Sequence, residues 1–127
     1  MKTSSFEDLI VWQQAHAFVL KAYTTTSCFP KEELFCLTSQ LRRAAVSVAA
    51  NIAEGYGRYH YKENRNFCFF SRGSILETKG WLKKARVRNL VNEEQYNVLF
   101  ENLQTIHIKL NAYLKFIGKA ATKGQDQ

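Results

Sequence analysis

Apolar residues that alternate three and four positions apart run without a break from Tyr96 to Ile117. The members of this series are Tyr96, Leu99, Leu103, Ile106, Leu110, Tyr113 and Ile117. On an α-helix such spacing places every member on one side, and it is the pattern of helices that pack nearly parallel. The segment therefore predicts one long helix that packs nearly parallel to its neighbours.

Three earlier segments have the same helical period. We expect helices from about Leu9 to Tyr23, from Pro30 to Gly55 and from His60 to Arg88. Their expected core residues are Leu9, Trp12, His16, Val19 and Tyr23 in the first, Leu34, Leu37, Leu41, Ala45, Val48 and Ile52 in the second, and Phe67, Phe70, Ser74, Trp81 and Ala85 in the third. With one proline and no long alternating stretch, the chain is predicted to be all-α, an up-down antiparallel four-helix bundle.

The ends of these helices are expected at sequence signals. Two pairs have the spacing of a capping box, Ser5 with Asp8 and Asn92 with Gln95. The last helix is expected to stop near Gly118, since glycine often follows a helix. We therefore predict one domain, residues 1–118, followed by a disordered tail, residues 119–127.

Cysteine usage and hydropathy bear on the cellular compartment. Cys28, Cys36 and Cys68 form no close pair, and three cysteines cannot all be joined in disulfides. We expect them to be buried apolar residues in a reducing compartment. The N-terminal residues do not resemble a signal peptide, and no run of about 18 apolar residues occurs. The expected location is the cytoplasm, with no membrane contact.

The second predicted helix is apolar nearly all round. Between Leu34 and Ala53 the only charged residues are Arg42 and Arg43. The side opposite its core residues carries Phe35, Val46, Ala49, Ala50 and Ala53. A helix that is apolar on every side is normally enclosed on every side, and one four-helix bundle cannot easily do this. We expect a subunit interface there; the alternative is that small alanines are simply exposed.

Known catalytic arrangements are absent from the sequence. No Glu-x-x-His pair for a di-iron site, no HExxH or CxxC zinc motif and no GxxxxGK[ST] phosphate loop occurs. Arg58 precedes His60 by two residues, whereas RNA-cleaving helical bundles use a spacing of four to six. His16 is interpreted as a hydrogen-bonded interior histidine. We expect no enzyme activity, no metal and no cofactor.

The positive charge is concentrated in the third predicted helix. Of the net charge of +7, a balance of +6 lies between Lys62 and Arg88. The basic residues there are Lys62, Arg65, Arg72, Lys79, Lys83, Lys84, Arg86 and Arg88. Four of them follow one another every seven residues, roughly opposite the apolar side of the helix. We predict that these residues bind RNA or DNA phosphates; the alternatives are an acidic protein partner or a solvated face.

A polar series on the second helix is interpreted as structural rather than catalytic. Its members are Gln40, Arg43, Ser47, Asn51 and Glu54, spaced three and four apart. On the third helix Gly73 and Gly80 flank Glu77, and glycine within a helix needs a reason such as the close approach of another helix. We expect Glu77 to pair with Arg43, while Ser74 completes the hydrogen bonds of this network.

These segments together resemble a known family. FEDLIVWQQA, QLRRAAVSVAANIAEG and GSILE resemble the four-helix bundle proteins encoded in intervening sequences of bacterial 23S rRNA genes. The resemblance covers about residues 6–118. It implies a bacterial homopentamer that forms a barrel and has no known catalytic residues. A related group, the accessory proteins of diversity-generating retroelements, binds nucleic acid and a reverse transcriptase, so the resemblance also implies an association with nucleic acid.

Overall fold

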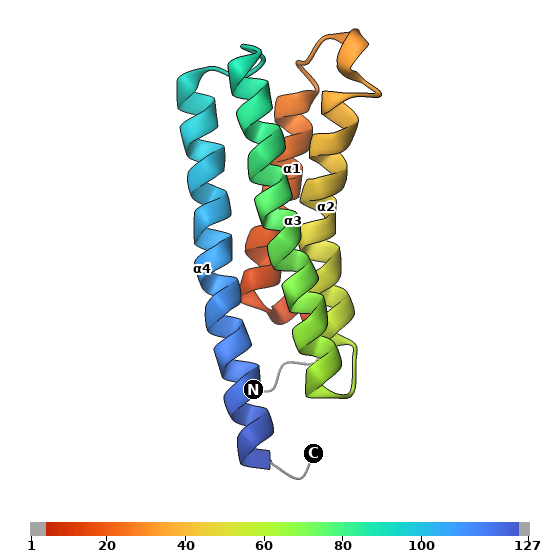
Figure 1. Ribbon diagram of the computed structural model, residues 1–127, viewed down its shortest axis with the longest axis vertical. Coiled ribbons are helices and arrows are strands. Elements are labelled where there is room, and N and C mark those ends of the chain that lie inside the picture. The colour runs from red at the N-terminus through yellow and green to blue at the C-terminus, as the bar shows by residue number, and fades with distance from the viewer. Residues whose placement is uncertain (1–4, 125–127) are drawn as a thin grey trace.

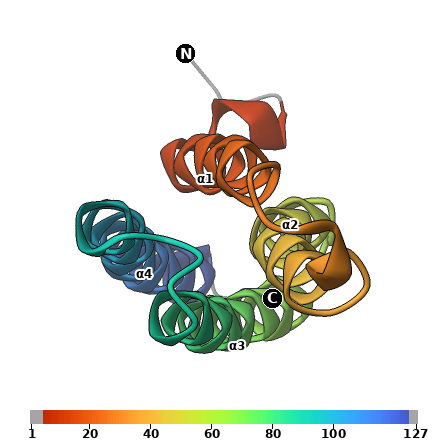
Figure 2. The ribbon, with the colours of Figure 1, turned by 90° about the horizontal axis from the view of Figure 1, so that it is seen from above.

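Four long α-helices make up most of the protein in a computed structural model, which describes residues 5–124. In chain order the elements are η1 (Phe6–Asp8), α1 (Ile10–Thr26), η2 (Lys31–Glu33), α2 (Leu37–Tyr56), α3 (Tyr61–Val87) and α4 (Glu93–Gly124). Consecutive helices run in opposite directions (Figure 1) and surround a common core in the order α1, α2, α3, α4 (Figure 2). The prediction of an all-α chain with four helices is confirmed, and the described part contains no strand.

The core of α4 follows the predicted series. Leu99, Leu103, Ile106 and Leu110 are buried, and Tyr96, Tyr113 and Ile117 pack partly buried against the same core. The start of the helix is also as expected. The backbone N–H of Asn92 donates to Gln95 Oε1 (2.9 Å), and that of Gln95 donates to Asn92 Oδ1 (2.8 Å), which is a reciprocal capping box.

The predicted core sides of α1 and α3 are wrong in part, because large residues were favoured over small ones. In α1 the buried residues are Val11, Ala15, Phe18, Ala22 and Thr26. His16 is not an interior residue: it is exposed and its ring stacks on that of Trp12, with ring centroids 4.8 Å apart. Tyr23 is also exposed.

In α3 the buried side includes hydroxyl-bearing residues in place of an aromatic one. Its buried residues are Cys68, Ser71, Ser74, Ile75, Thr78, Leu82 and Ala85. Ser71 Oγ donates to the carbonyl oxygen of Val48 in α2 (2.8 Å), and Thr78 Oγ1 donates to that of Ser74 (2.6 Å). These hydroxyls can be buried because each has a hydrogen-bond partner. Phe70, which was expected in the core, is 57% exposed.

The second helix begins later than predicted. The segment from Pro30 turns through η2 and then breaks, so that α2 starts at Leu37. At this break the side chain of Glu33 is buried: Oε1 accepts from the backbone N–H of Leu37 (3.4 Å) and Oε2 pairs with Arg88 Nη2 (2.6 Å). Leu34, predicted to be a core residue, is 47% exposed.

The last helix does not stop at Gly118 but continues to Gly124. Gly118 instead allows a close contact with α3, since a Cβ atom there would lie 3.2 Å from the hydroxyl oxygen of Tyr61. The prediction of a tail from residue 119 is therefore wrong as far as residue 124, and residues 125–127 lie outside the described part of the chain. At the other end, Ser5 accepts a hydrogen bond from Glu7 (3.2 Å) and caps η1, not α1.

The cysteines are not all buried as predicted. Cys28 and Cys36 are exposed, and only Cys68 is buried. Burial raises the pKa of the Cys68 thiol to about 11, an effect that the nearby charge of Arg72 partly opposes. The thiol therefore stays protonated in the core. None of the helices within residues 5–124 has the length and apolar character needed to cross a bilayer.

The helices α2 and α3 approach each other closely at Gly55. A Cβ atom on Gly55 would lie 2.7 Å from Asn64 Oδ1, 2.9 Å from Phe67 Cβ and 3.0 Å from the carbonyl oxygen of Asn64. Because one of these neighbours is backbone, the clash cannot be relieved by turning a single side chain. A glycine is thus required for the two helices to approach at this level.

We expect Gly55→Ala to lower the free energy of unfolding by about 1–3 kcal/mol, the usual cost of overpacking. Gly57→Ala is the matched control, because a Cβ atom on Gly57 would come no closer than 3.6 Å to its neighbours. Urea unfolding followed by circular dichroism measures both. Equal midpoints for the two variants would show that α3 can move away from Gly55 without loss.

Candidate nucleic-acid interface

Four cations of α3 form a row beside α4. We call Arg65, Arg72, Lys79 and Arg86 the basic row; they recur every seven residues, or every two helical turns, and span about 30 Å. Arg72 Nη1 donates to Asn111 Oδ1 (3.0 Å) and Lys79 Nζ donates to Gln104 Oε1 (3.4 Å), both on α4. The row therefore runs along the edge where α3 and α4 meet.

Aromatic rings hold three cations of the basic row in place. The guanidinium carbon of Arg72 lies 4.9 Å from the ring centroid of Phe69, and that of Arg65 lies 5.4 Å from the ring centroid of Tyr61. Lys79 Nζ lies 5.0 Å from the ring centroid of Phe100 in α4. Such cation–π contacts restrict the side chains while leaving their charge in place.

No carboxylate of the described residues forms an ion pair with the basic row. Among residues 5–124 the ion pairs join Arg58 to Glu54 and Arg88 to Glu33, and neither involves the row. Arg65 Nε is buried and has no hydrogen-bond partner in that part of the chain. The cations thus meet aromatic rings and neutral amides, contacts that leave their positive charge in place.

The pKa of His107 in α4 is affected both by burial and by cations of the basic row. Its pKa is lowered from the ordinary histidine value, first because burial disfavours the charged ring and then because Lys79 and Arg72 repel a further positive charge. The imidazole is therefore neutral near pH 7. The residues of α4 that face the row, Phe100, Gln104, His107 and Asn111, were not predicted; their spacing of four, three and four is the signal that could have found them.

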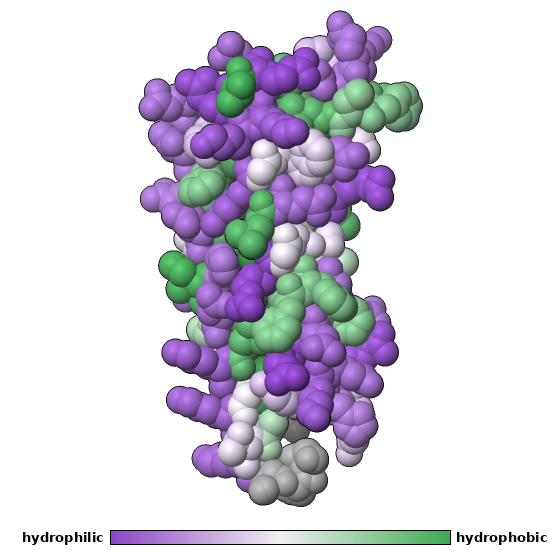
Figure 3. Space-filling view, in the orientation of Figure 1, coloured by the Kyte–Doolittle hydropathy of each residue, from purple (hydrophilic) through white to green (hydrophobic). Residues whose placement is uncertain are grey.

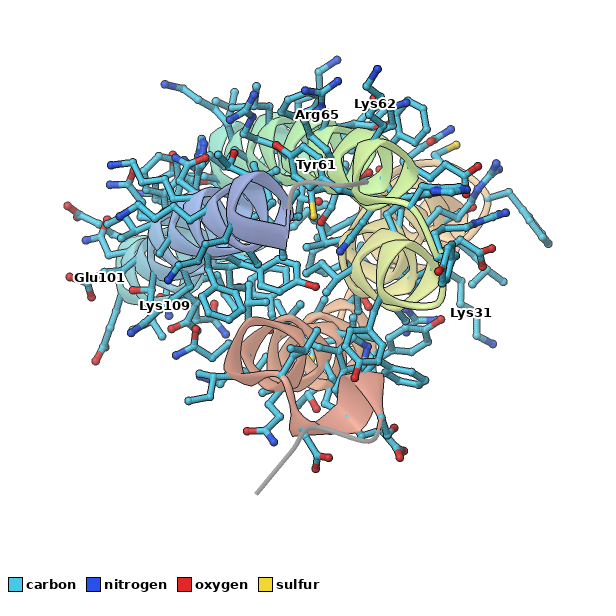
Figure 4. The ribbon with its side chains drawn as sticks, turned by 90° about the horizontal axis from the view of Figure 1, so that it is seen from below. Lys31, Tyr61, Lys62, Arg65, Glu101 and Lys109 are labelled. Atoms are coloured by element: carbon cyan, nitrogen blue, oxygen red, sulfur yellow. The ribbon has the colours of Figure 1, made fainter. Side chains whose placement is uncertain are left out.

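The remaining predicted basic residues lie away from the row. Lys83, Lys84 and Arg88 line a groove between the last turns of α3 and the segment that joins η2 to α2. Lys62 lies at the opposite end of α3 and points outward from the bundle, as does Arg65 (Figure 4). The structure therefore divides the eight predicted residues into a row, a groove and one isolated lysine.

Part of the predicted polar network is present between α2 and α3. Ser74 Oγ donates to Ser47 Oγ (2.8 Å), and Asn51 Nδ2 donates to Ser47 Oγ (2.9 Å). Asn51 Nδ2 also donates to the carbonyl oxygen of Ser47 (2.9 Å). These three side chains join the two helices, as the spacing predicted.

The predicted pair of Arg43 and Glu77 is wrong. Both side chains are exposed and they form no ion pair within the described residues; Glu77 Oε2 instead accepts a hydrogen bond from Trp81 Nε1 (3.3 Å). Glu54 pairs with Arg58 of its own segment (2.7 Å), and Gln40 lines the groove. A carboxylate in solvent gains little from an ion pair, so Glu77 has no need of a buried partner.

The glycines of α3 face open space. A Cβ atom on Gly73 or Gly80 would meet nothing within 4 Å, so no other helix within residues 5–124 packs closely against these glycines. Phe70 and Leu76 on the same helix are each 57% exposed. Figure 3 accordingly shows apolar patches interrupting the hydrophilic surface on the face that presents α3.

Metal-binding groups do not gather in the described residues. No cluster of three histidine, cysteine, aspartate or glutamate side chains there could hold a metal ion.

Comparison with known proteins gives one family and one fold. A family model described as 23S rRNA-intervening sequence protein matches residues 7–112. Among solved structures, the chain is similar to a protein with unknown function from the S23 ribosomal protein family of Bacteroides thetaiotaomicron, with a TM-score of 0.75 and 20% sequence identity over 84% of this chain and 99% of that chain. At that identity the likeness shows the fold alone. No curated protein matches the chain.

The lowered pKa of His107 leads to a test of the potential along the row. In an NMR titration the imidazole pKa should lie below the ordinary histidine value of about 6.5, and Lys79→Gln should raise it because one repelling charge is removed. Lys62→Gln, at the far end of α3, should leave it unchanged. Since the folded-state pKa is lowered, the stability linked to this group is present above pH 6.5 and declines as the pH falls through the folded-state value. An unchanged pKa in Lys79→Gln would contradict the proposed potential.

Proposed function

The chain belongs to the family of 23S rRNA-intervening sequence proteins, and from that premise we propose that it is a non-enzymatic, cytoplasmic homo-oligomer that binds RNA or DNA through the basic row. The observation that carries the proposal is that the row has no carboxylate partner within residues 5–124. Ordinary protein surfaces mix charges of both signs. A row of cations about 30 Å long is suited to contact several phosphates of one nucleic acid.

A phosphate could readily replace the neutral partners that two cations of the row have in the protein. Asn111 and Gln104 are neutral amides, so a phosphate that displaces them from Arg72 and Lys79 forms stronger, charge-assisted hydrogen bonds. Because the rings of Phe69 and Phe100 already restrict two of the cations, less side-chain entropy is lost on binding.

Binding of this kind depends on charge rather than on base sequence. Contacts to phosphate fix position on a nucleic acid but do not read it, and counterion release makes the affinity fall steeply with salt. We therefore expect salt-sensitive, sequence-tolerant binding.

Exposed apolar surface supports the proposal of a homo-oligomer. Val46 is 40% exposed and Ala50 is exposed on the outer side of α2. On α3, Gly73 and Gly80 leave room for a close helix contact. A second copy that covers these surfaces would bury the apolar groups and give the glycines a function, and the family resemblance favours a pentamer.

Replacing two cations of the row tests the nucleic-acid proposal. We expect Arg72→Gln/Lys79→Gln to weaken binding to RNA and duplex DNA at least about tenfold at low salt and to reduce the salt slope by about two. The control Lys115→Gln/Lys119→Gln removes the same charge from exposed positions of α4 and should have little effect. Gel-shift titrations at several salt concentrations measure both, and light scattering confirms that assembly is unchanged.

Two results would contradict this proposal. Equal losses in both double variants would mean that only net charge matters. No binding at low salt would favour the second candidate, a scaffold whose cations contact an acidic protein, which co-purification after nuclease treatment would detect.

The open glycines provide a test of assembly. We expect Gly73→Ala/Gly80→Ala to reduce the mass measured by light scattering, because two methyl groups would separate the helices of adjacent subunits. The folded protomer should not be weakened, since alanine favours a helix by about 1 kcal/mol over glycine and both Cβ atoms meet open space. An unchanged mass together with a higher melting temperature would place the glycines on a free surface.

A further inference from the structure

A groove at the C-terminal end of α3 combines aromatic and basic side chains. It has a volume of about 620 Å³ and lies between α3 and the segment joining η2 to α2. We call it the aromatic groove after two of its lining residues, Phe35 and Trp81. Its cations are Lys83, Lys84 and Arg88. In Figure 3 the η2–α2 segment at the upper right carries a light green, apolar projection.

Phe35 is the unusual residue of this groove. Its side chain is 87% exposed, between a short 3-10 turn and the first residue of α2. A free phenylalanine ring in this position contributes little to the core. Trp81 lies across the groove, partly buried, with its indole N–H donating to Glu77 and with Lys84 Nζ 5.2 Å from its ring centroid.

The charge of the groove is positive despite the carboxylate that lines it. Glu33 is 6% exposed; one of its oxygens accepts from the backbone of Leu37 and the other pairs with Arg88. Its negative charge is therefore neutralised within the protein. Lys83 and Lys84 are exposed and form no ion pair in the described part of the chain, so they are free to meet an anion.

We propose that the aromatic groove binds unpaired nucleotides, with a base stacked on Phe35 and the phosphates held by Lys83 and Lys84. This inference rests on the proposed function and refines it: the basic row contacts phosphates of any nucleic acid, whereas the groove selects single-stranded segments. A base in a duplex cannot reach an aromatic ring outside the stack, but an unpaired base can, and each stacked base is recognised whatever its identity. Single-strand-binding proteins likewise combine a positively charged groove with aromatic side chains on which bases stack.

The experiment separates stacking from phosphate contacts. Fluorescence anisotropy is measured with a labelled single-stranded RNA 12-mer of mixed sequence, the same length of abasic oligonucleotide, and the corresponding duplex. The full-length protein should bind the base-carrying strand more tightly than the abasic one. Phe35→Ala should weaken binding to the base-carrying strand by about fivefold or more, as for loss of one stacked base, and leave the abasic affinity unchanged.

Two variants serve as controls. Phe116→Ala removes a ring that is 67% exposed on α4 and should change neither affinity. Phe35→Trp should keep the preference for bases, because tryptophan also offers a flat ring. Since Phe35 makes little contact with the core, neither replacement of it should impair folding.

The outcomes distinguish this inference from the function it rests on. If Arg72→Gln/Lys79→Gln weakens binding to every oligonucleotide while Phe35→Ala changes nothing, the basic row stands and the groove is not a nucleotide site. If the wild-type protein binds none of the oligonucleotides, both proposals fail. If Phe35→Ala lowers the mass measured by light scattering, the groove is a contact between subunits and the inference is overturned.

Discussion

Hydroxyl groups and a glycine lie where α2 and α3 meet, and their contacts set the rotation of α3 about its own axis. Ser71 reaches the backbone of Val48, Ser74 reaches Ser47, and Gly55 admits the backbone of Asn64. Since side chains on a helix have fixed angular positions, this rotation determines where every cation of α3 lies. The basic row meets α4, and the lysines near the end of α3 meet the turn before α2.

Two sides of α4 make different contacts. Leucines and isoleucines of the regular series fill the core, while Gln104, His107 and Asn111 lie against the basic row. The amides of Gln104 and Asn111 accept hydrogen bonds from the cations, and the imidazole of His107 adds no charge of its own. Neither cancels the positive charge of the row. Carboxylates in the same positions would hold the arginines more firmly but would compete with phosphate. The neutral partners are thus consistent with a surface that has to release its internal hydrogen bonds when an anion arrives.

Much of the fold could be predicted from local spacing, whereas the errors arose where contacts between helices decide which side is buried. The series from Tyr96 to Ile117 and the capping box at Asn92 depend only on neighbours along the chain, and both are confirmed. The rotation of α3 depends on serine hydroxyls that can be buried because they form hydrogen bonds with α2. A hydropathy pattern does not show such bonds. His16 was placed in the core for a different reason, because the small alanines of α1 were discounted as core residues.

The candidate site was less accessible to sequence reasoning. The excess of basic residues identified the cations of α3. Whether these cations form one surface depends on which of them lie on the edge of α3 beside α4 and which lie on the edge beside α2. The spacing predicted the row correctly and could not separate it from Lys83, Lys84 and Arg88. The proposed link between Arg43 and Glu77 failed because an exposed carboxylate gains little from a partner.

The ion pair between Glu33 and Arg88 couples substitutions at two positions that are far apart in the chain. Glu33 is buried, and its carboxylate is satisfied by the guanidinium of Arg88 2.6 Å away and by the backbone N–H of Leu37; without the arginine it would lose its ion-pair partner. A lineage that loses the arginine therefore has to replace the glutamate with an uncharged residue. The two positions should vary together across related chains, and the turn before α2 should keep its shape only where both are retained.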